Sequence, residues 1–269
     1  MSLVRDIAIC LRVVPFSETS QVVTLLTREH GRLKLIAKGA RRQTKAGKGR
    51  FDGGLDVLDR GDALFSHAPE KELGLLAEWK LIDGHRNLRD DLRAVWLGQY
   101  AAEVVDRLLE EHDAHPRLFD GMARLLQRLA EPAVREAVAL AFLLNVLRQA
   151  GLLPDFSRCR EASVDGRLVP LSRAVAERRA IGFDADEARL MCGEPGESPD
   201  ELFRARPSLA PVGREAIVAI VQLLGLSRGG GDLPVIDRPA ADAAHRLLVT
   251  HIRHQTDARL RLARFVLGD

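Results

Sequence analysis

The stretch "QVVTLLTREHGRLKLIAK" (residues 21–38) holds two apolar runs separated by a short polar turn. In residues 31–38 apolar side chains alternate with mostly basic ones, which is the pattern of a strand with one buried face. The turn "EHGR" (29–32) contains Gly31, which can adopt the positive φ that a tight hairpin requires. The stretch therefore predicts a β-hairpin. The basic positions on the outward side of its second strand are Arg32, Lys34 and Lys38.

Three further stretches around this hairpin have the composition of strands, at residues 5–14, 56–67 and 73–83. With the hairpin they make five short strands within about eighty residues. Short antiparallel strands at this spacing close into small barrels or pack into sandwiches. Residues 1–82 are therefore expected to form one small β-domain.

The spacing of apolar residues changes from that of a strand to that of a helix at about residue 84. Residues 87–112 predict one helix, and Pro116 and Pro132 each open another, the last of which ends at Gly151. Segment 152–197 is rich in Gly, Pro, Asp and Arg and is expected to be irregular. Helical patterns return in residues 199–205, 213–226 and 239–267.

These patterns together predict an α+β fold in which a β-domain precedes an all-α domain with a small irregular insert. The expected parts are the β-domain at 1–82, the first helical part at 83–151, the insert at 152–197 and the second helical part at 198–269.

Positive charge is concentrated in one short region, although the whole chain carries a net charge of only +2. Residues 28–50 hold nine basic residues against one acidic residue, Glu29. Focused charge attracts polyanions, but a basic loop can also be no more than well solvated, and composition alone leaves both interpretations open. The candidate anion-binding residues are Arg32, Lys34, Lys38, Arg41, Arg42, Lys45, Lys48 and Arg50.

Cysteine usage and the N-terminus indicate the compartment. Three scattered cysteines do not form a disulfide framework in a chain of 269 residues. The opening "MSLVRDIAIC" (1–10) lacks the features of a signal peptide, and the apolar stretches fall short of the ~20 residues that a membrane span needs. A cytosolic protein is expected.

No sequence pattern for catalysis accompanies these features. There is no nucleotide-binding glycine motif and no GxSxG nucleophile motif, so an enzyme is not expected. His251 and His254 lie one helical turn apart but lack further metal ligands, and they are expected on the surface. Arginines in the last predicted helix either bind an anion or cover an apolar face with their stems. They are Arg246, Arg253, Arg259, Arg261 and Arg264.

Three segments resemble a known family in the same order along the chain. The most specific is "ICLRVVPFSETSQVVTLLTREHGRLKLIAKGARR" (9–42), followed by "RQAGLLPDFSRC" (148–159) and "LLVTHIRHQTDARLRLARFV" (247–266). They resemble the bacterial DNA repair protein RecO family. The resemblance implies an oligonucleotide/oligosaccharide-binding (OB-fold) barrel of five strands followed by a helical domain with a small insert, which agrees with the layout predicted above.

The insert departs from the family's pattern. Many members carry two Cys-x-x-Cys pairs there, which form a four-thiolate zinc site. In this chain Cys159 is followed at the second-ligand spacing by Ala162, and Cys192 by Pro195. Because two thiolates do not complete a tetrahedral structural site, the insert is expected to be degenerate, with no zinc and no other cofactor.

The resemblance implies a recombination mediator that binds single- and double-stranded DNA, anneals complementary strands, and helps RecR load RecA on DNA coated by single-stranded DNA-binding protein. The basic residues above would then contact DNA, and Phe51 would either stack on a base or be a core or edge residue. A second hypothesis is a helical adaptor without an essential DNA role, which captures an acidic peptide tail. Its binding residues would be Arg253, Arg259 and Arg261.

Overall fold

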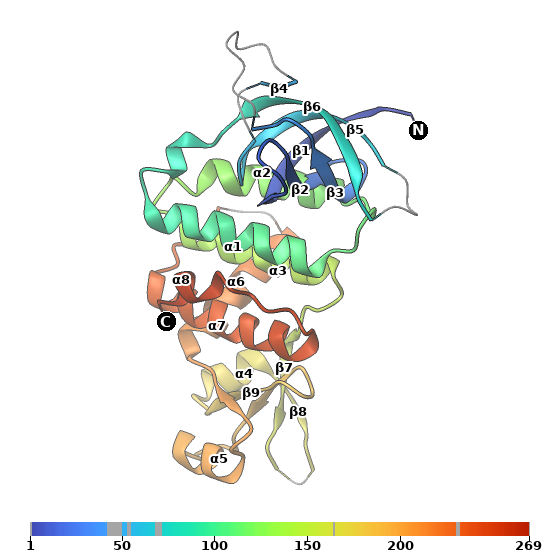
Figure 1. Ribbon diagram of the computed structural model, residues 1–269. Coiled ribbons are helices and arrows are strands. Elements are labelled where there is room, and N and C mark those ends of the chain that lie inside the picture. Colours follow the sequence, from blue (N-terminus) through green and yellow to red (C-terminus); the bar gives the residue numbers. More distant parts are fainter. Residues whose placement is uncertain are drawn as a thin grey trace. The chain divides into compact units, whose positions relative to one another are not determined.

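The computed structural model describes residues 2–41, 50–52, 55–67, 72–163, 165–229 and 232–268 (Figure 1). The chain divides into two compact units, Met1–Glu131 and Pro132–Asp269. The boundary expected at 82/83 thus differs from the division by contacts, which groups the first two helices with the β-domain. No helix in the described ranges combines the length and the apolar character that a bilayer crossing requires.

The first unit contains a closed barrel with the expected OB-fold topology. Neighbouring strands follow the order β3-β2-β1-β5-β6, and a parallel pairing of β3 with β6 closes the sheet, while the short β4 lies beside β6. This confirms the five-stranded barrel among the residues described. The strands are β1 (Val4–Pro15), β2 (Gln21–Thr27), β3 (Gly31–Ala37), β4 (Phe51–Asp52), β5 (Arg60–Ser66) and β6 (Gly74–Asp83).

Alternation along the strands builds the barrel core. Leu33, Leu35 and Ala37 of β3 are fully buried, and their neighbours in sequence point outward. The largest side chains inside are Phe65 and Trp79. An irregularity between Cys10 and Arg12 of β1 shifts the register by one residue, so that Cys10 and Val13 both face the core.

Two helices complete the first unit: α1 (Leu92–Leu108) and α2 (Pro116–Arg128), preceded by a 3-10 turn, η1 (Arg86–Leu88). Helix α1 begins at Leu92, later than the expected start at residue 87, because the Asp91 side chain accepts hydrogen bonds from the N–H groups of Arg93 and Ala94. Gly98 lets α1 approach its neighbours closely, since a Cβ there would lie 2.9 Å from Leu58.

The second unit combines helices with a small sheet. Its last predicted helix is interrupted, which corrects the expectation of one helix over 239–267. The Thr256 hydroxyl donates to the Ile252 carbonyl, the backbone of Thr256 is extended, and helix α7 ends there. The helices are α3 (Arg135–Gln149), α4 (Leu171–Ala176), α5 (Pro199–Ala205), α6 (Arg214–Gly229), α7 (Arg238–Gln255) and α8 (Ala263–Leu267).

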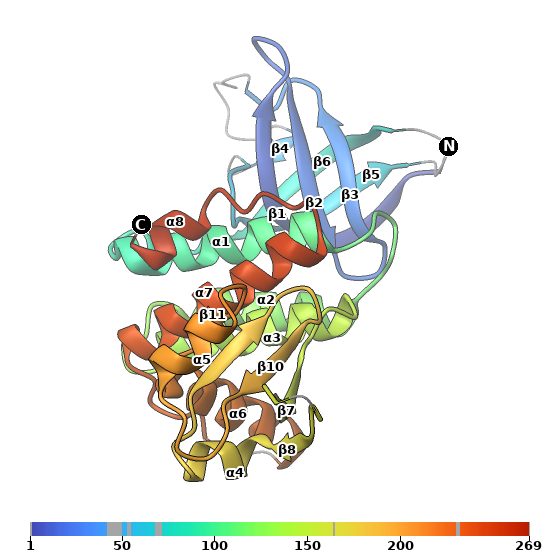
Figure 2. The ribbon, with the colours of Figure 1, turned by 90° about the horizontal axis from the view of Figure 1, so that it is seen from below.

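The expectation that segment 152–197 is irregular is wrong. It folds into most of a mixed sheet with the order β11-β9-β10-β7-β8, next to α4 and α5 (Figure 2). The strands were missed because they are short and their parallel pairing, β10 with β7, joins residues far apart in sequence. They are β7 (Asp155–Glu161), β8 (Leu168–Pro170), β9 (Ile181–Asp184), β10 (Arg189–Cys192) and β11 (Ala210–Pro211).

Candidate nucleic-acid interface

The outer face of strands β1, β2 and β3 carries most of the described candidate residues. Register pairs Arg12 with Thr24 and Thr24 with Lys34, and pairs Val14 with Val22 and Val22 with Ile36. These two rows cross all three strands on the side opposite the core. We call this surface the β1–β3 face, and its two ends differ in what covers them.

One end of the β1–β3 face is covered by α1 and the chain that follows it. Ile9 and Leu11 point away from the barrel core yet are buried, and α1 packs against β1. The guanidinium of Arg32 donates to the Leu109 carbonyl (3.0 Å) and lies 3.2 Å from the Asp106 carboxylate. Arg32 therefore joins the barrel to α1.

Lys34 is also engaged at this end. Its ammonium lies 2.5 Å from the Glu111 carboxylate, which in turn is 3.5 Å from Arg32. Partial burial alone would raise the pKa of Glu111, but the hydrogen bond from Lys34 and the charges of Lys34 and Arg32 outweigh it and hold this pKa below its usual value. Glu111 is thus ionised and pairs with Lys34 and Arg32, two cations that were expected on a free surface.

The other end of the β1–β3 face is open and basic. Lys38 follows β3, and Arg41 is tied to the β1–β2 turn because its N–H donates to the Thr19 carbonyl (3.2 Å). Lys38 and Arg41 are exposed, and neither forms an ion pair with a carboxylate of the described residues. The predicted basic residues thus fall into two groups. Arg32 and Lys34 form ion pairs within the fold, whereas Lys38 and Arg41 face solvent.

The remaining candidates lie around residues 42–50. Arg50 is exposed, and its carbonyl accepts a hydrogen bond from the Trp79 N–H (2.7 Å), which places it along β6. Arg42, Lys45 and Lys48 fall outside the described residues.

Aromatic side chains near this surface differ in exposure. Phe51 packs against the barrel core, so of its two expected roles the structure shows the core one. Phe16, directly after β1, is 62% exposed. Sequence reasoning passed over Phe16 because the irregularity in β1 hides which of its residues face outward.

A second basic site lies in the other unit. Arg253, Arg259 and Arg261 line one hollow of about 580 Å³ together with Asp257 and Arg264. Arg253 belongs to α7, whereas Arg259 and Arg261 lie in the connection to α8, so the three arginines meet across a bend and not along one helix.

The two histidines of α7 that were expected on the surface differ in burial. His254 is exposed as expected, but the expectation is wrong for His251, which is buried with its Nε2 2.6 Å from the Leu152 carbonyl.

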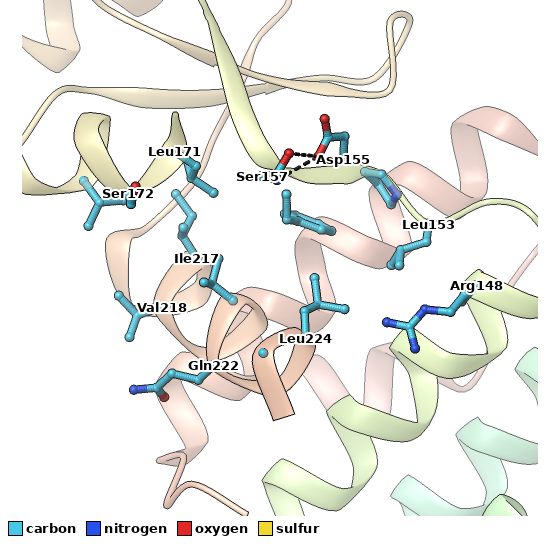
Figure 3. A pocket seen from close by; sticks show the side chains of 15 residues that line it. Arg148, Leu153, Asp155, Ser157, Leu171, Ser172, Ile217, Val218, Gln222 and Leu224 are labelled. Carbon is cyan, nitrogen blue, oxygen red and sulfur yellow. Dashed lines mark hydrogen bonds between the residues drawn. The ribbon is translucent and has the colours of Figure 1, made fainter. Parts of the chain in front are cut away.

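The second unit also has an apolar groove of about 510 Å³ (Figure 3). Ile217, Val218 and Leu224 of α6 form one side, and Arg148 at the end of α3 lies across from them. Val218 and Val221 are exposed there. The groove offers an apolar surface with one cation at its edge.

The residues around Cys159 and Cys192 do not fit a structural zinc ion. Cys159 and Cys192 are buried, and the Cys159 thiol donates to the Val169 carbonyl (3.8 Å). Interaction with Cys192 and then burial raise the pKa of Cys159, whereas interaction with Cys159 and the charge of Arg179 lower the pKa of Cys192. The Arg179 guanidinium is 2.7 Å from Glu161 and 2.7 Å from Glu177. A cation already occupies the position beside the thiols, and no group of three potential ligands occurs in the described ranges.

Comparison with known proteins agrees with this architecture. The family model "Recombination protein O N terminal" matches residues 1–85, which include the barrel, and "Recombination protein O C terminal" matches residues 89–191. The chain is 30% identical over 252 residues to the DNA repair protein RecO of Anaeromyxobacter sp. (strain Fw109-5), covering 93% of this chain and 91% of the relative.

Other relatives carry the same name. The DNA repair protein RecO of Anaeromyxobacter dehalogenans (strain 2CP-C) is 29% identical over 266 residues, covering 99% of this chain and 96% of the relative. That of Rhodopirellula baltica is 37% identical over 175 residues, covering 65% and 62%. The barrel topology, both family models and the full-length relatives agree, and the chain therefore belongs to the RecO family of DNA repair proteins.

Proposed function

We propose that this protein is a recombination mediator that binds single- and double-stranded DNA without sequence specificity and anneals complementary strands. The observation that supports this most directly is the open, unpaired basic end of the β1–β3 face at Lys38 and Arg41. Further expected roles are loading RecA together with RecR on DNA coated by single-stranded DNA-binding protein, in the bacterial cytoplasm at the nucleoid. It performs no hydrolysis in this role.

The physics of annealing suits such a surface. Two strands repel each other through their phosphates, and cations that replace condensed counterions reduce that repulsion without reading bases. Arg41 can make forked contacts to phosphate oxygens, while Lys38 acts as a point charge. Arg32 and Lys34 contribute less than the sequence suggests, because Asp106 and Glu111 already pair with them.

The test is DNA binding and strand annealing across salt concentration. The double substitution Lys38→Gln with Arg41→Gln is expected to weaken binding and to reduce the slope of log affinity against log salt by about 2, one per lost phosphate contact. The matched control is Arg167→Gln with Arg204→Gln, two exposed arginines of the second unit. If the first pair leaves both affinity and slope at the wild-type values, the assigned surface is wrong.

A second candidate role is capture of an acidic peptide, such as the C-terminal tail of single-stranded DNA-binding protein. It is supported by the grouping of Arg253, Arg259 and Arg261 around one hollow. Anisotropy of a labelled tail peptide is expected to show weaker binding for Arg253→Gln with Arg259→Gln, but not for Arg204→Gln. Unchanged peptide affinity in the double variant would exclude this hollow. The two roles can coexist, because they use different units.

A further inference from the structure

Phe16 differs from every other aromatic side chain in the part of the chain that the structure describes. It is 62% exposed, whereas each of the other Phe, Tyr and Trp residues there is buried or half-buried. A single exposed apolar side chain is common on protein surfaces, so the groups around this ring, and not its exposure alone, indicate a partner.

The backbone around Phe16 is held by several hydrogen bonds. Pro15 precedes it and ends β1. The N–H of Phe16 donates to the Ser20 carbonyl (3.0 Å), and the N–H of Ser17 donates to the same carbonyl (3.1 Å). The Ser20 N–H in turn donates to the Ser17 hydroxyl (3.1 Å). The turn therefore presents the ring from a fixed backbone, which reduces the entropy lost when a ligand binds.

Strand register places Phe16 on the β1–β3 face. Val14, two residues earlier, is paired with Val22 on the outward side, and alternation brings Phe16 to the same side. The last paired row across the three strands is Pro15, Gln21 and Ala37, and Phe16 and Lys38 each follow this row directly along the chain. Phe16 and Lys38 therefore lie at the same end of the β1–β3 face.

Arg41 belongs to the same end of the barrel. Its N–H donates to the carbonyl of Thr19, within the turn that carries Phe16. The exposed ring therefore lies near exposed cations with which no described carboxylate forms an ion pair, although the exposed Glu18 belongs to the same turn. Apolar protein partners favour patches depleted of charge, whereas nucleic acid requires cations for phosphates and a ring for bases.

We propose that Phe16 is a base-stacking residue and that this end of the β1–β3 face prefers nucleic acid with unpaired bases. Lys38 and Arg41 contact the phosphates, and the Phe16 ring stacks on one base of the strand. A duplex has its bases already stacked on each other and offers no free ring face in its interior, so Phe16 adds affinity only for single strands. This inference rests on the proposed DNA binding and adds strand preference to it.

The test compares three substitutions in the full chain. Phe16→Ala removes the ring, Phe16→Trp keeps an aromatic ring, and Leu92→Ala is the control, since Leu92 is 61% exposed on α1 of the same unit. Affinity is measured by anisotropy with oligo-dT of about 16 nucleotides and with a duplex of the same length. Circular dichroism establishes that each variant is folded.

Phe16→Ala is expected to weaken binding of oligo-dT about 10-fold, to leave duplex binding unchanged, and to leave the salt slope unchanged because no charge is lost. Phe16→Trp is expected to restore the affinity, and oligo-dT is expected to quench its fluorescence beyond the change seen in wild type. Leu92→Ala is expected to bind as wild type does.

The outcomes separate this inference from the proposed function. If Phe16→Ala binds oligo-dT as wild type does while Lys38→Gln with Arg41→Gln weakens both DNAs, base stacking is wrong and DNA binding at this surface stands. If neither change matters, both proposals fail. Equal loss on single strands and duplex, or loss of binding to a protein partner alone, also overturns the stacking role.

Discussion

The guanidinium of Arg32 lies 3.2 Å from the carboxylate of Asp106, and the two side chains are only 12% and 10% exposed. This ion pair joins strand β3 to helix α1, a connection across 74 residues of sequence. Lys38, six residues further along, is exposed at the other end of the same face. Neighbouring cations that look equivalent in the sequence therefore lie in different environments, one paired within the fold and one facing solvent.

Substituting these two cations separates stability from DNA affinity. Arg32→Met leaves the Asp106 carboxylate without its partner in a largely buried position, and is expected to lower the free energy of unfolding by about 3 kcal/mol. Lys38→Met removes an exposed charge and is expected to stay within about 0.5 kcal/mol of wild type. Urea unfolding, followed by the fluorescence of Trp79 and Trp96, measures both.

The same pair of variants is expected to differ in the opposite sense for DNA. Lys38→Met reduces the salt slope of binding by about 1, whereas Arg32→Met leaves that slope unchanged under conditions where it is folded. A stable Arg32→Met variant with a reduced slope would show that Arg32 contacts phosphate and that the pairing with Asp106 opens on binding.

The barrel was predictable because its information is local. Alternation in residues 31–38 places β3 at Gly31–Ala37, and the turn residue Gly31 has a φ of +72°. The insert was not predictable in the same way, because β7 reads "DFSRCRE", with few apolar residues and no alternation that repeats. It becomes a strand through its pairing with β10 and β8, and the partners of a strand cannot be read from its own composition.

The candidate site was predictable in composition but not in geometry. The sequence shows that the barrel is basic, but Glu111 lies 77 residues from Lys34 and only the fold brings them to 2.5 Å. The exposure of Phe16 likewise depends on the shifted register in β1, which moves the outward side by one residue after Cys10. Alternation of apolar and polar residues does not show where a single extra residue reverses the inward and outward sides of a strand.

Gly31 allows the close contact between the β2–β3 hairpin and the chain after α1. A Cβ at this position would lie 2.2 Å from the carbonyl oxygen of Asp113, and the φ of +72° disfavours any other residue. Gly31→Ala is therefore expected to lower the free energy of unfolding by more than the ~1 kcal/mol that positive φ alone costs.

Gly151→Ala is the matched control for Gly31→Ala. Gly151 has a φ of +69°, but a Cβ at this position would meet no atom within 4 Å, so only the backbone term applies. Equal destabilisation by the two substitutions in urea unfolding would show that the Asp113 segment moves aside without cost.

Three histidine rings meet where the hairpin, β5 and the chain after α1 come together. His67 stacks on His112 with ring centroids 5.1 Å apart and lies 6.1 Å from His30, which in turn bonds to Asp6 (2.8 Å). Burial, and then the positive charges that His112 and His30 can carry, lower the pKa of His67. Glu111, on the same segment as His112, is held by Lys34 and Arg32.

This cluster predicts that stability decreases in mild acid. Because the pKa of His67 is lower in the folded protein than its unfolded value of about 6.5, the unfolded chain binds more protons as the pH falls through that value. The free energy of unfolding is therefore expected to fall between pH of about 7.5 and 5.5. His67→Gln is expected to reduce this fall, while His85 and His251, whose pKa values burial also lowers, preserve part of it.

Wild-type protein measured in the same buffers is the reference for this experiment. A fall of the same size in His67→Gln and wild type would mean that protonation at this cluster does not oppose folding.

Arg179 gives the last prediction, because it holds the insert together beside Cys159 and Cys192. Its side chain is 3% exposed and pairs with Glu161 and Glu177, on strand β7 and after α4. Arg179→Met leaves both carboxylates unpaired and is expected to destabilise the insert by about 3 kcal/mol, seen as faster hydrogen exchange in 155–192. Arg173→Gln, which removes only an exposed ion pair with Glu177, is expected to change hydrogen exchange little.

Since Arg179 supplies the cation beside these thiols, a metal chelator is expected to leave the melting temperature unchanged. Stoichiometric zinc in the purified protein, or a lower melting temperature in chelator, would contradict this account, because a metal ion and the guanidinium would then have to share the same two thiols.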